Sequence, residues 1–506
     1  MINRRTFVLG SVAGAMGAAG MTSISAATSD FAFRTGSADS GRGLGDSRSL
    51  GWQPPRLDQL DCGRMEMDGK LPDGLRGVFH RNGPAGHHRH GFRYGHWFDG
   101  DGMVQAFRFS DSGVAHQGRM IMTPKLRDED AARRRLYPVF ATPVVDSVPL
   151  RTPDDMNSAN ISILDHHGEL MALWEGGSAS RLDRDTLEWK GFKDWGGGSR
   201  GAPFTAHPKV DRDGTLWAFG IAIRPKPTLV LYHIASTGRL VKAAVLPVES
   251  LGMVHDFVVT DRHLVIVIPP FVYREDRGET FLDAHVWEPK RGSRALVVSK
   301  NDFDDRRWVQ LPAGFGFHHG NGWEEPDGTI RFDHCLSADP ALVNDVFRRV
   351  MDGDFRPTSP PTYTRFAIRT DGSVEIMDSG RVAEFPQILP SLAGRRNRFV
   401  YTLGTTGHGP VWLPRTLVRQ DLDGGSVESF DFGEDQIPEE HVFVPFPEGT
   451  AEDDGWLVGP VLAHRRGVSG ITVFDARRIA DGPVATAWLP YPLPLGFHGS
   501  FSADRV

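Results

Sequence analysis

From about residue 100 onward, short runs of apolar residues alternate with tight polar turns. The segments RLDRDTLEW (181–189), FAIRTDGSVEIM (366–377) and VRQDLDGGSVESF (418–430) place apolar residues at alternate positions on both sides of a turn rich in Asp, Gly, Ser and Thr. Period-two alternation interrupted by such turns is typical of antiparallel β-hairpins. The pattern therefore predicts an all-β chain.

Seven turns of this kind recur, about 62 residues apart on average, which is the signature of a radial repeat. They are marked by Ser112, Thr186, Thr237, Gly292, Asp371, Gly424 and Asp481. A seven-bladed β-propeller, with four strands per blade around a central channel and loops and short helices capping one face, accounts for the spacing. A β-sandwich array with coincidental spacing is the alternative, and the turn at Arg291-Gly292 is the weakest marker.

The first residues of the chain predict export. Residues 1–27 contain Arg4-Arg5, then Phe7 and a mild Gly/Ala-rich apolar stretch, which resembles a twin-arginine signal peptide and predicts a periplasmic location. An ordinary secretory signal with a chance arginine pair is the alternative. Residues 28–50 have little to bury and predict a disordered linker, so that the propeller domain is expected over 51–506.

Composition narrows the class of partner. A net charge of -7 and a pI near 6.3 give no basic surplus, so no nucleic-acid partner is expected. Only two cysteines occur, Cys62 and Cys335. They form no disulfide framework and no CxxC metal motif, so neither pairing nor cysteine-bound metal is favoured.

Four histidines lie at the ends of short apolar runs beside turn residues. They are His207 in FTAHPKVD, His255 in GMVHDFVVT, His318 in FHHGNGWEE and His498 in LGFHGSF. In a propeller the innermost strand of each blade faces the axis, so histidines from four blades would meet there. Neutral imidazoles suit iron, copper, zinc or nickel. Each histidine taken alone is equally consistent with a hydrogen-bonded core residue.

Three glutamates occur in apolar settings where a free carboxylate would be costly: Glu175 in MALWEGG, Glu384 in AEFPQI and Glu440 in PEEHVFV. A metal-bound imidazole usually donates its other N–H to a carboxylate or a carbonyl. Support of the ligating histidines would therefore explain all three glutamates. Each one alone is equally consistent with a structural or solvated role.

Seven motifs, in order, resemble the carotenoid cleavage oxygenase family, and the likeness runs from about Arg81 to Phe501. They are HWFDGDGMV, TAHPKVD, MVHDFVVT, FHHGNGWEE, EFPQI, EDDGWL and GFHGSF. The resemblance implies a seven-bladed propeller with one axial non-haem Fe(II) per chain, held by His207, His255, His318 and His498, with Glu175, Glu384 and Glu440 supporting the ligands. The family pattern of aromatic-His-x-x-Asn selects His318 over His319, and strand alternation turns His319 away.

The implied reaction is oxidative cleavage of a conjugated carbon–carbon double bond in a carotenoid or apocarotenoid. Dioxygen is the second substrate, 2-oxoglutarate is not needed, and two carbonyl products form, as expected for a dioxygenase. Cleavage of a stilbenoid is the alternative, for which Tyr94 and Lys125 are candidate contacts to a phenol oxygen. Lys125 is equally consistent with a solvated lysine at the end of a strand. A propeller that binds a ligand without redox chemistry is a third hypothesis.

Two apolar stretches bear on how a substrate arrives. LYPVFATPVV (136–145) and PPFVY (269–273) would suit the mouth of an apolar tunnel and peripheral contact with a membrane, and each is equally consistent with core packing.

Overall fold

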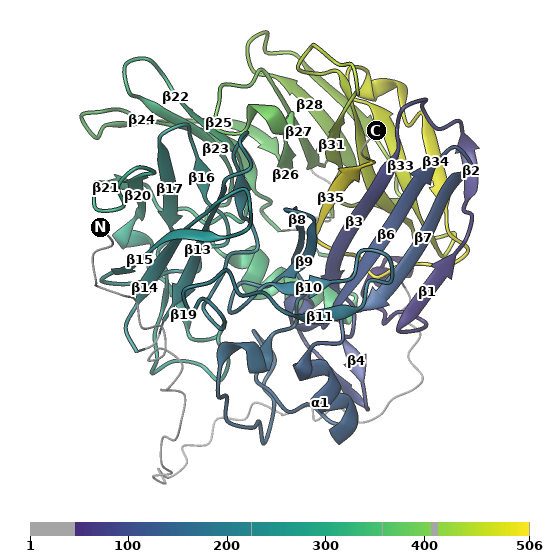
Figure 1. Cartoon of the computed structure of the whole chain (residues 1–506), viewed down its shortest axis with the longest axis horizontal. Helices are drawn as coiled ribbons and strands as arrows, with labels where there is room; N and C mark the ends of the chain where they lie inside the picture. Colours follow the sequence, from purple (N-terminus) through teal and green to yellow (C-terminus); the bar gives the residue numbers. More distant parts are fainter. Residues whose placement is uncertain (1–45, 224, 357, 406–412, 505–506) are drawn as a thin grey trace.

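The structure is a computed structural model that describes residues 46–504, apart from residues 224, 357 and 406–412. Seven sheets of four or more antiparallel strands surround a common centre, as Figure 1 shows. This confirms the predicted seven-bladed propeller. The predicted signal peptide, residues 1–27, lies outside the described residues, as does most of the predicted linker, residues 28–50.

Four blades are meanders whose strands follow one another in chain order. From the innermost strand outward they are β8 (Ser162–His166), β9 (Glu169–Leu173), β10 (Ser180–Leu182) and β11 (Trp189–Phe192); β12 (Lys209–Val210), β13 (Leu216–Ala222), β14 (Thr228–Ile234) and β15 (Leu240–Pro247); β22 (His319–Glu324), β23 (Ile330–Leu336), β24 (Thr362–Ile368) and β25 (Val374–Val382); and β26 (Glu384–Gln387), β27 (Phe399–Gly404), β28 (Thr416–Asp421) and β29 (Val427–Asp431).

A fifth blade contains an insertion. Its strands are β16 (Val258–Val259), β17 (His263–Ile268), β20 (Ser293–Ser299) and β21 (Arg306–Leu311), and the hairpin of β18 (Phe271–Tyr273) and β19 (His285–Trp287) is inserted between the second and third. The Arg291-Gly292 turn belongs to this insertion, in the 3-10 helix η5 (Pro289–Arg291) and the residue after it. Its use as a marker of an outer hairpin was wrong. The other six markers all lie between the third and fourth strands of a blade.

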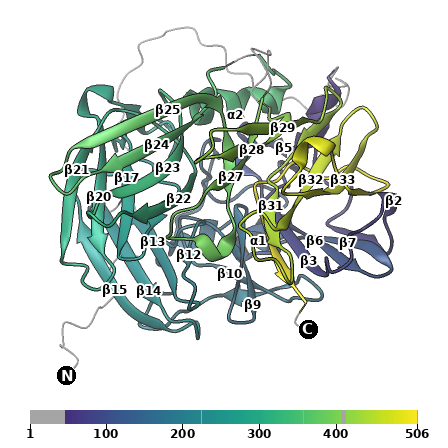
Figure 2. The same ribbon diagram turned by 90° about the horizontal axis from the view of Figure 1, so that it is seen from above.

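The last two blades join the two ends of the domain and close the ring. One consists of β35 (His498–Ala503), β3 (Gly77–Pro84), β6 (Gly102–Ser110), β7 (Gly113–Met120) and β1 (Gln59–Cys62); the other of β30 (Gln436–Pro438) and β31 (Val442–Pro445), which both pair with β32 (Gly455–Ala463), then β33 (Val468–Asp475), β34 (Ala485–Trp488) and β2 (Glu66–Gly69). Figures 1 and 2 show the N-terminal strands beside the C-terminal ones.

Short helices and loops cover one side of the propeller, as predicted. They include α1 (Pro124–Ala132), α2 (Phe347–Arg349), the π-helical η6 (Leu342–Val346), the 3-10 helices η2 (Ser47–Trp52), η3 (Trp97–Asp99), η4 (Pro153–Met156) and η7 (Val350–Asp352), and the hairpin of β4 (His88–Arg89) and β5 (Phe92–Arg93). The 3-10 helices η8 (Pro390–Leu392) and η9 (Ile479–Asp481) follow the first and the third strand of their blades and therefore lie on the other side. Helix α1 begins after Thr123, whose hydroxyl accepts from the amide of Leu126, with Pro124 at its first position. None of the described helices is long and apolar enough to cross a membrane.

The start of the domain corrects the predicted linker boundary. Helix η2 begins at Ser47, and Trp52 within it is 1 % exposed, with its ring 5.3 Å from that of Trp97. Residues 46–50 are therefore part of the folded domain, because the apolar contact of Trp52 holds the segment in place.

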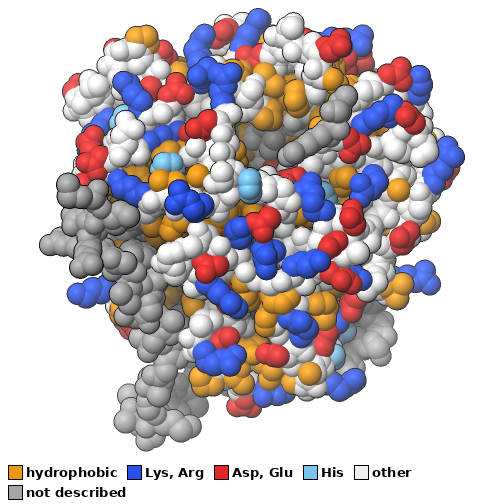
Figure 3. Space-filling model, viewed as in Figure 1, with side chains coloured by type: hydrophobic (Ala, Val, Ile, Leu, Met, Phe, Trp, Pro, Cys, Tyr) orange, Lys and Arg blue, Asp and Glu red, His pale blue; other side chains and the backbone are white. Residues whose placement is uncertain are grey.

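Apolar side chains fill the spaces between neighbouring blades. One core cluster joins residues of β13 and β14 to residues of β17 and β20, and another joins β9 to β13 and β14. In β7, buried and half-buried residues alternate strictly, as period-two patterning requires. On the face seen in Figure 3, basic and acidic side chains are interspersed, which agrees with the absence of a basic surplus. Cys62 and Cys335 are unpaired.

Candidate metal centre

Four histidines converge on the propeller axis. His498 is the first residue of the innermost strand β35, His318 immediately precedes β22, and His207 and His255 lie just before β12 and β16. One ring nitrogen from each lies within 4.8 Å of the others. Because the inner strands of different blades face one another, residues up to 291 positions apart in sequence share one site.

Local backbone contacts fix the first two histidines. Pro208 follows His207 and restricts it to extended backbone. The hydroxyl of Thr205 accepts from the amide of His207 at 3.0 Å and reaches the carbonyl oxygen of His255 at 3.5 Å. Thr205 therefore links the two chain segments that carry these imidazoles.

The four imidazoles offer the same kind of ring nitrogen to the centre. The Nε2 atoms of His207 and His255 are 2.8 Å apart, and those of His318 and His498 are 3.2 Å apart. Burial, together with the neighbouring imidazoles, lowers the pKa of His207 and His318 well below the ordinary value. Neutral nitrogen donors packed this closely are suited to a transition-metal ion, so the residues fit the predicted metal.

Glutamates support three of the four histidines. The Nδ1 atoms of His318 and His498 lie 2.5 Å from Oε2 of Glu384 and 3.2 Å from Oε1 of Glu440, and Nδ1 of His255 contacts Glu175. These contacts hold each ring with Nε2 toward the centre. The three glutamates singled out from the sequence thus contact three of the four histidines.

The carboxylates are themselves fixed. Glu440 accepts from the Gln387 amide at 3.0 Å and from the backbone amide of Gly499 at 2.7 Å.

Burial raises the pKa of Glu384 to about 8. The next residue, Phe385, has a φ of 53°, a left-handed conformation that costs a non-glycine residue about 1–3 kcal/mol. Such strain is tolerated where the surrounding packing over-determines the backbone.

His319 is not part of the cluster. Its ring stacks on His334 with centroids 4.0 Å apart, and its amide donates to Asp256 at 2.9 Å. Successive residues of a strand point to opposite faces, so His319 faces away from His318.

Three of the four histidines, His255, His318 and His498, line a cavity of about 610 Å³. Its aromatic lining includes Phe98, Phe317, Phe385 and Phe497, which also contact one another or the metal-site imidazoles. The sequence motifs contained all four, yet sequence reasoning did not identify them as site residues. Their positions next to the predicted histidines, to Glu384 or within HWFDGDGMV were the available signal.

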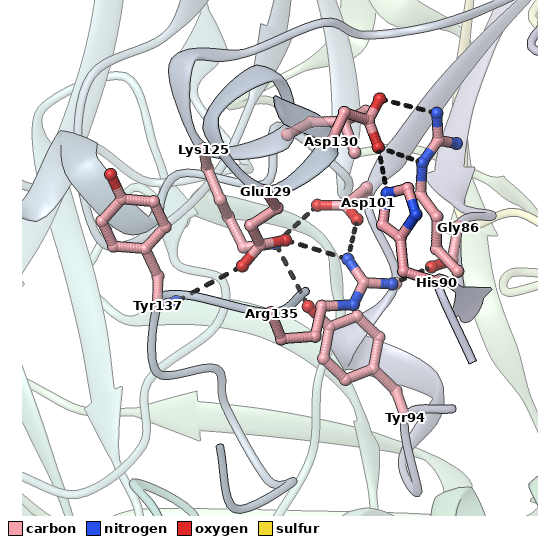
Figure 4. A network of polar contacts seen from close by, with 12 residues as sticks. Gly86, His90, Tyr94, Asp101, Lys125, Glu129, Asp130, Arg135 and Tyr137 are labelled. Atoms are coloured by element: carbon pink, nitrogen blue, oxygen red, sulfur yellow. Dashed lines mark hydrogen bonds and ion pairs between the residues drawn. The ribbon is translucent and has the colours of Figure 1, made fainter. Parts of the chain in front are cut away.

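The predicted substrate contacts Tyr94 and Lys125 require a correction. Lys125 is 0 % exposed and Tyr94 is 1 % exposed, and neither lines the cavity. They belong to the buried network in Figure 4, in which Lys125 Nζ donates to Asp101 at 2.6 Å, to Glu129 at 3.2 Å and to the Tyr94 hydroxyl at 3.2 Å. Arg135 donates to both carboxylates. The lysine charge is thus neutralised by these carboxylates, away from the cavity.

The apolar stretches predicted to form a tunnel mouth contribute to the cavity in part. Val139 and Phe140 from the first stretch and Tyr273 from the second line it, whereas Val145 is 79 % exposed and does not. Only some residues of each stretch therefore form part of the cavity wall.

Replacing Glu384 with glutamine is expected to weaken metal binding about ten- to a hundred-fold. A bound cation favours the charged form of Glu384, and an amide holds the His318 N–H less strongly than a carboxylate does. Anaerobic titration with Fe(II) measures the effect. Glu324→Gln is the matched control, since Glu324 accepts from the His263 ring at 2.9 Å outside the cluster. Equal affinity in Glu384→Gln and the unmodified protein would contradict the role of Glu384.

Comparison with known proteins agrees with this geometry. The model of the RPE65 (retinal pigment epithelial membrane protein) family matches residues 54–503. Apocarotenoid-15,15'-oxygenase of Synechocystis is 30 % identical over 467 residues, covering 86 % of this chain and 92 % of the relative. Isoeugenol monooxygenase of Pseudomonas nitroreducens is 28 % identical, covering 90 % and 97 %.

A solved structure shows the same architecture. The crystal structure of cobalt-substituted Synechocystis ACO superimposes with a TM-score of 0.82 at 27 % identity, over 91 % of this chain and 99 % of that one. The match of a family model to nearly the whole described domain, the seven blades and the four-histidine cluster agree with one another. The chain therefore belongs to the RPE65/carotenoid cleavage oxygenase family.

Proposed function

We propose that the protein is an Fe(II)-dependent oxygenase that cleaves a conjugated double bond of an apocarotenoid or carotenoid into two carbonyl products. The observation that carries the proposal is the convergence of four imidazoles, within 4.8 Å of one another, beside an aromatic-lined cavity of about 610 Å³. Family membership supports the coarser statement, an alkene-cleaving oxygenase with a four-histidine metal site. The choice of iron as the metal and of a carotenoid-derived compound as the substrate goes beyond family membership and belongs to the proposal.

When bound, a ferrous ion would supply the activation of dioxygen, because four neutral imidazoles leave its charge uncancelled. His207, His255, His318 and His498 would hold it. The three glutamates contact the Nδ1 atoms of three of these rings and orient them. The protein's own contribution is therefore position and the exclusion of water.

The cavity wall both positions the substrate and excludes water. Phe98, Phe317 and Phe497 form adjoining ring contacts at 5.2–5.7 Å, with Phe347 of α2 packed against Phe98 at 5.0 Å. Flat aromatic surfaces bind a conjugated chain and keep water from the reacting bond. Where the wall stops the chain determines which double bond lies beside the histidines.

A second candidate substrate is a phenolic alkene such as a stilbenoid. The relative named isoeugenol monooxygenase supports it, as the apocarotenoid oxygenase supports the first. A membrane-facing mouth is proposed only for the carotenoid case. A propeller that binds a ligand without redox chemistry has the same fold and requires no iron.

Side-by-side assays distinguish these candidates. Protein reconstituted anaerobically with Fe(II) is mixed in air with an apocarotenoid or with a hydroxystilbene, while the conjugated absorption is followed and aldehydes are identified by mass. We expect aldehydes from the apocarotenoid, and none from metal-free protein. Aldehydes from the stilbene alone would establish the second candidate, and none from either compound would overturn the proposed function.

We also propose that the protein is exported by the twin-arginine route, on the basis of Arg4-Arg5 and the mild apolar stretch after them. Changing both arginines to lysine is expected to leave the protein in the cytoplasm of its host. Fractionation and immunoblotting measure this. Unchanged export of the variant would refute the route.

A further inference from the structure

The inserted hairpin of β18 and β19 presents two polar aromatic side chains to the cavity. Tyr273 and His285 are direct cross-strand partners, and both line the cavity. The rings of Phe271 and Phe281 lie 5.0 and 4.8 Å from the His285 ring. His285 is thus enclosed by aromatic side chains beside the space that a substrate enters.

The proton on His285 can be assigned from its contacts. Nδ1 lies 2.8 Å from the carbonyl oxygen of Phe281, and because a carbonyl only accepts, Nδ1 carries the hydrogen. Burial lowers the pKa of His285 to about 4, so the ring is neutral at physiological pH. Nε2 is therefore a bare hydrogen-bond acceptor.

That acceptor has no partner among the described residues. Among all the described residues, four histidines have a buried ring nitrogen without a hydrogen-bond partner: His80, His87, His166 and His285. Of these four, His285 alone lines the cavity. An unmatched acceptor in apolar surroundings is unfavourable, and a donor that arrives with a ligand removes the penalty. His285 thus differs from the other three in lying beside the cavity, and a guest molecule reaches its buried Nε2 once the ring turns toward the cavity.

We propose that Nε2 of His285 accepts a hydrogen bond from a hydroxyl group of the substrate, so that the substrate is a conjugated alkene with a free hydroxyl at one end. The inference rests on the proposed function and deepens it. Ethers and carboxylates offer only acceptors and leave Nε2 unmatched. An alcohol on an apocarotenoid and a phenol on a stilbene share the required chemistry. His285 is then a residue that determines specificity and fixes which bond reaches the histidines.

A site built around a hydroxyl rejects the analogue that lacks it. Each hydroxylated compound, an apocarotenoid alcohol and a hydroxystilbene, is compared with its own methyl ether. We expect the protein to bind and cleave the free hydroxyl form of one pair about ten- to a hundred-fold better than its ether. The pair that shows the preference identifies which source of the hydroxyl the site accepts.

Binding is measured separately from cleavage, by quenching of tryptophan fluorescence, since Trp97 and Trp174 line the cavity. His285→Phe is expected to bind the two members of the pair equally while retaining iron. His166→Phe is the matched control, because His166 has the same arrangement, with Nε2 at 2.9 Å from a carbonyl oxygen and Nδ1 without a partner, but does not line the cavity. It should keep the preference.

The outcomes separate the two claims. Equal binding of alcohol and ether by the unmodified protein, in both pairs, would overturn the role of His285, whether or not cleavage occurs. So would a preference that His285→Phe retains. A preference in binding that His285→Phe abolishes, without any cleavage by the iron-loaded protein, would support His285 while rejecting the proposed oxygenase function.

Discussion

His318→Ala is expected to lose bound iron and to cleave substrate at least about a thousand-fold more slowly than the unmodified protein. The variant removes one of four nitrogen donors and leaves Glu384, which His318 contacts at 2.5 Å, as a buried carboxylate without its imidazole. Iron is measured per chain after anaerobic reconstitution, and the cleavage rate from the loss of conjugated absorption.

His319→Ala is the matched control for this variant. The two histidines are neighbours in sequence and are both buried, but His319 stacks on His334 outside the cluster. It should retain one iron per chain. Full iron and full activity in His318→Ala, or equal losses in both variants, would show that the cluster is not the metal site.

Lys125→Met is expected to destabilise the fold by about 3–5 kcal/mol, because it removes one cation from a fully buried network and leaves Asp101 and Glu129 with only Arg135. Methionine has a similar length, so the loss arises from charge rather than from a cavity. The free energy of unfolding is measured with denaturant. Iron binding should persist in the folded variant, since Lys125 does not line the cavity.

Lys190→Met is the control for the loss of an ion pair at the surface. Lys190 pairs with Asp183 at 2.8 Å but its side chain is 53 % exposed, so we expect a much smaller loss of stability than in Lys125→Met. If the two lysine variants were equally stable, the buried network in Figure 4 would not stabilise the fold.

The repeat of hairpin turns predicted the number of blades because six of its seven markers lie at the same place in each blade, between the third and fourth strands. The seventh failed for a local reason. The inserted β18–β19 hairpin brings its own turn at Arg291-Gly292, whereas the true outer turn, between β20 and β21, has the sequence KNDFDD without glycine. Closure of the ring depends on the pairing of β2 with β34 and of β3 with β35 across the whole chain, which local patterning does not encode.

More of the metal centre than of the rest of the site could be identified from the sequence. The family pattern of aromatic-His-x-x-Asn selects His318, and period-two alternation then turns His319 away. Apolar flanks made the three glutamates candidates, and the resemblance assigned their role. The surroundings of Lys125 could not be predicted, because its partner Asp101 and the second cation Arg135, which also binds Asp101, come from separate loops whose directions depend on tertiary packing. His285 lies in LDAHVW, outside every motif recognised in the sequence, so its unmatched nitrogen became evident only in the folded chain.

The most direct test of the account is the rate of alkene cleavage measured against iron bound per chain during stepwise anaerobic loading with Fe(II), each sample being then exposed to air with substrate. The account predicts a rate that rises in proportion to bound iron, begins at zero for metal-free protein and levels off at one iron per chain. Cleavage by metal-free protein, or one iron bound per chain with no carbonyl product from either substrate class, would contradict it.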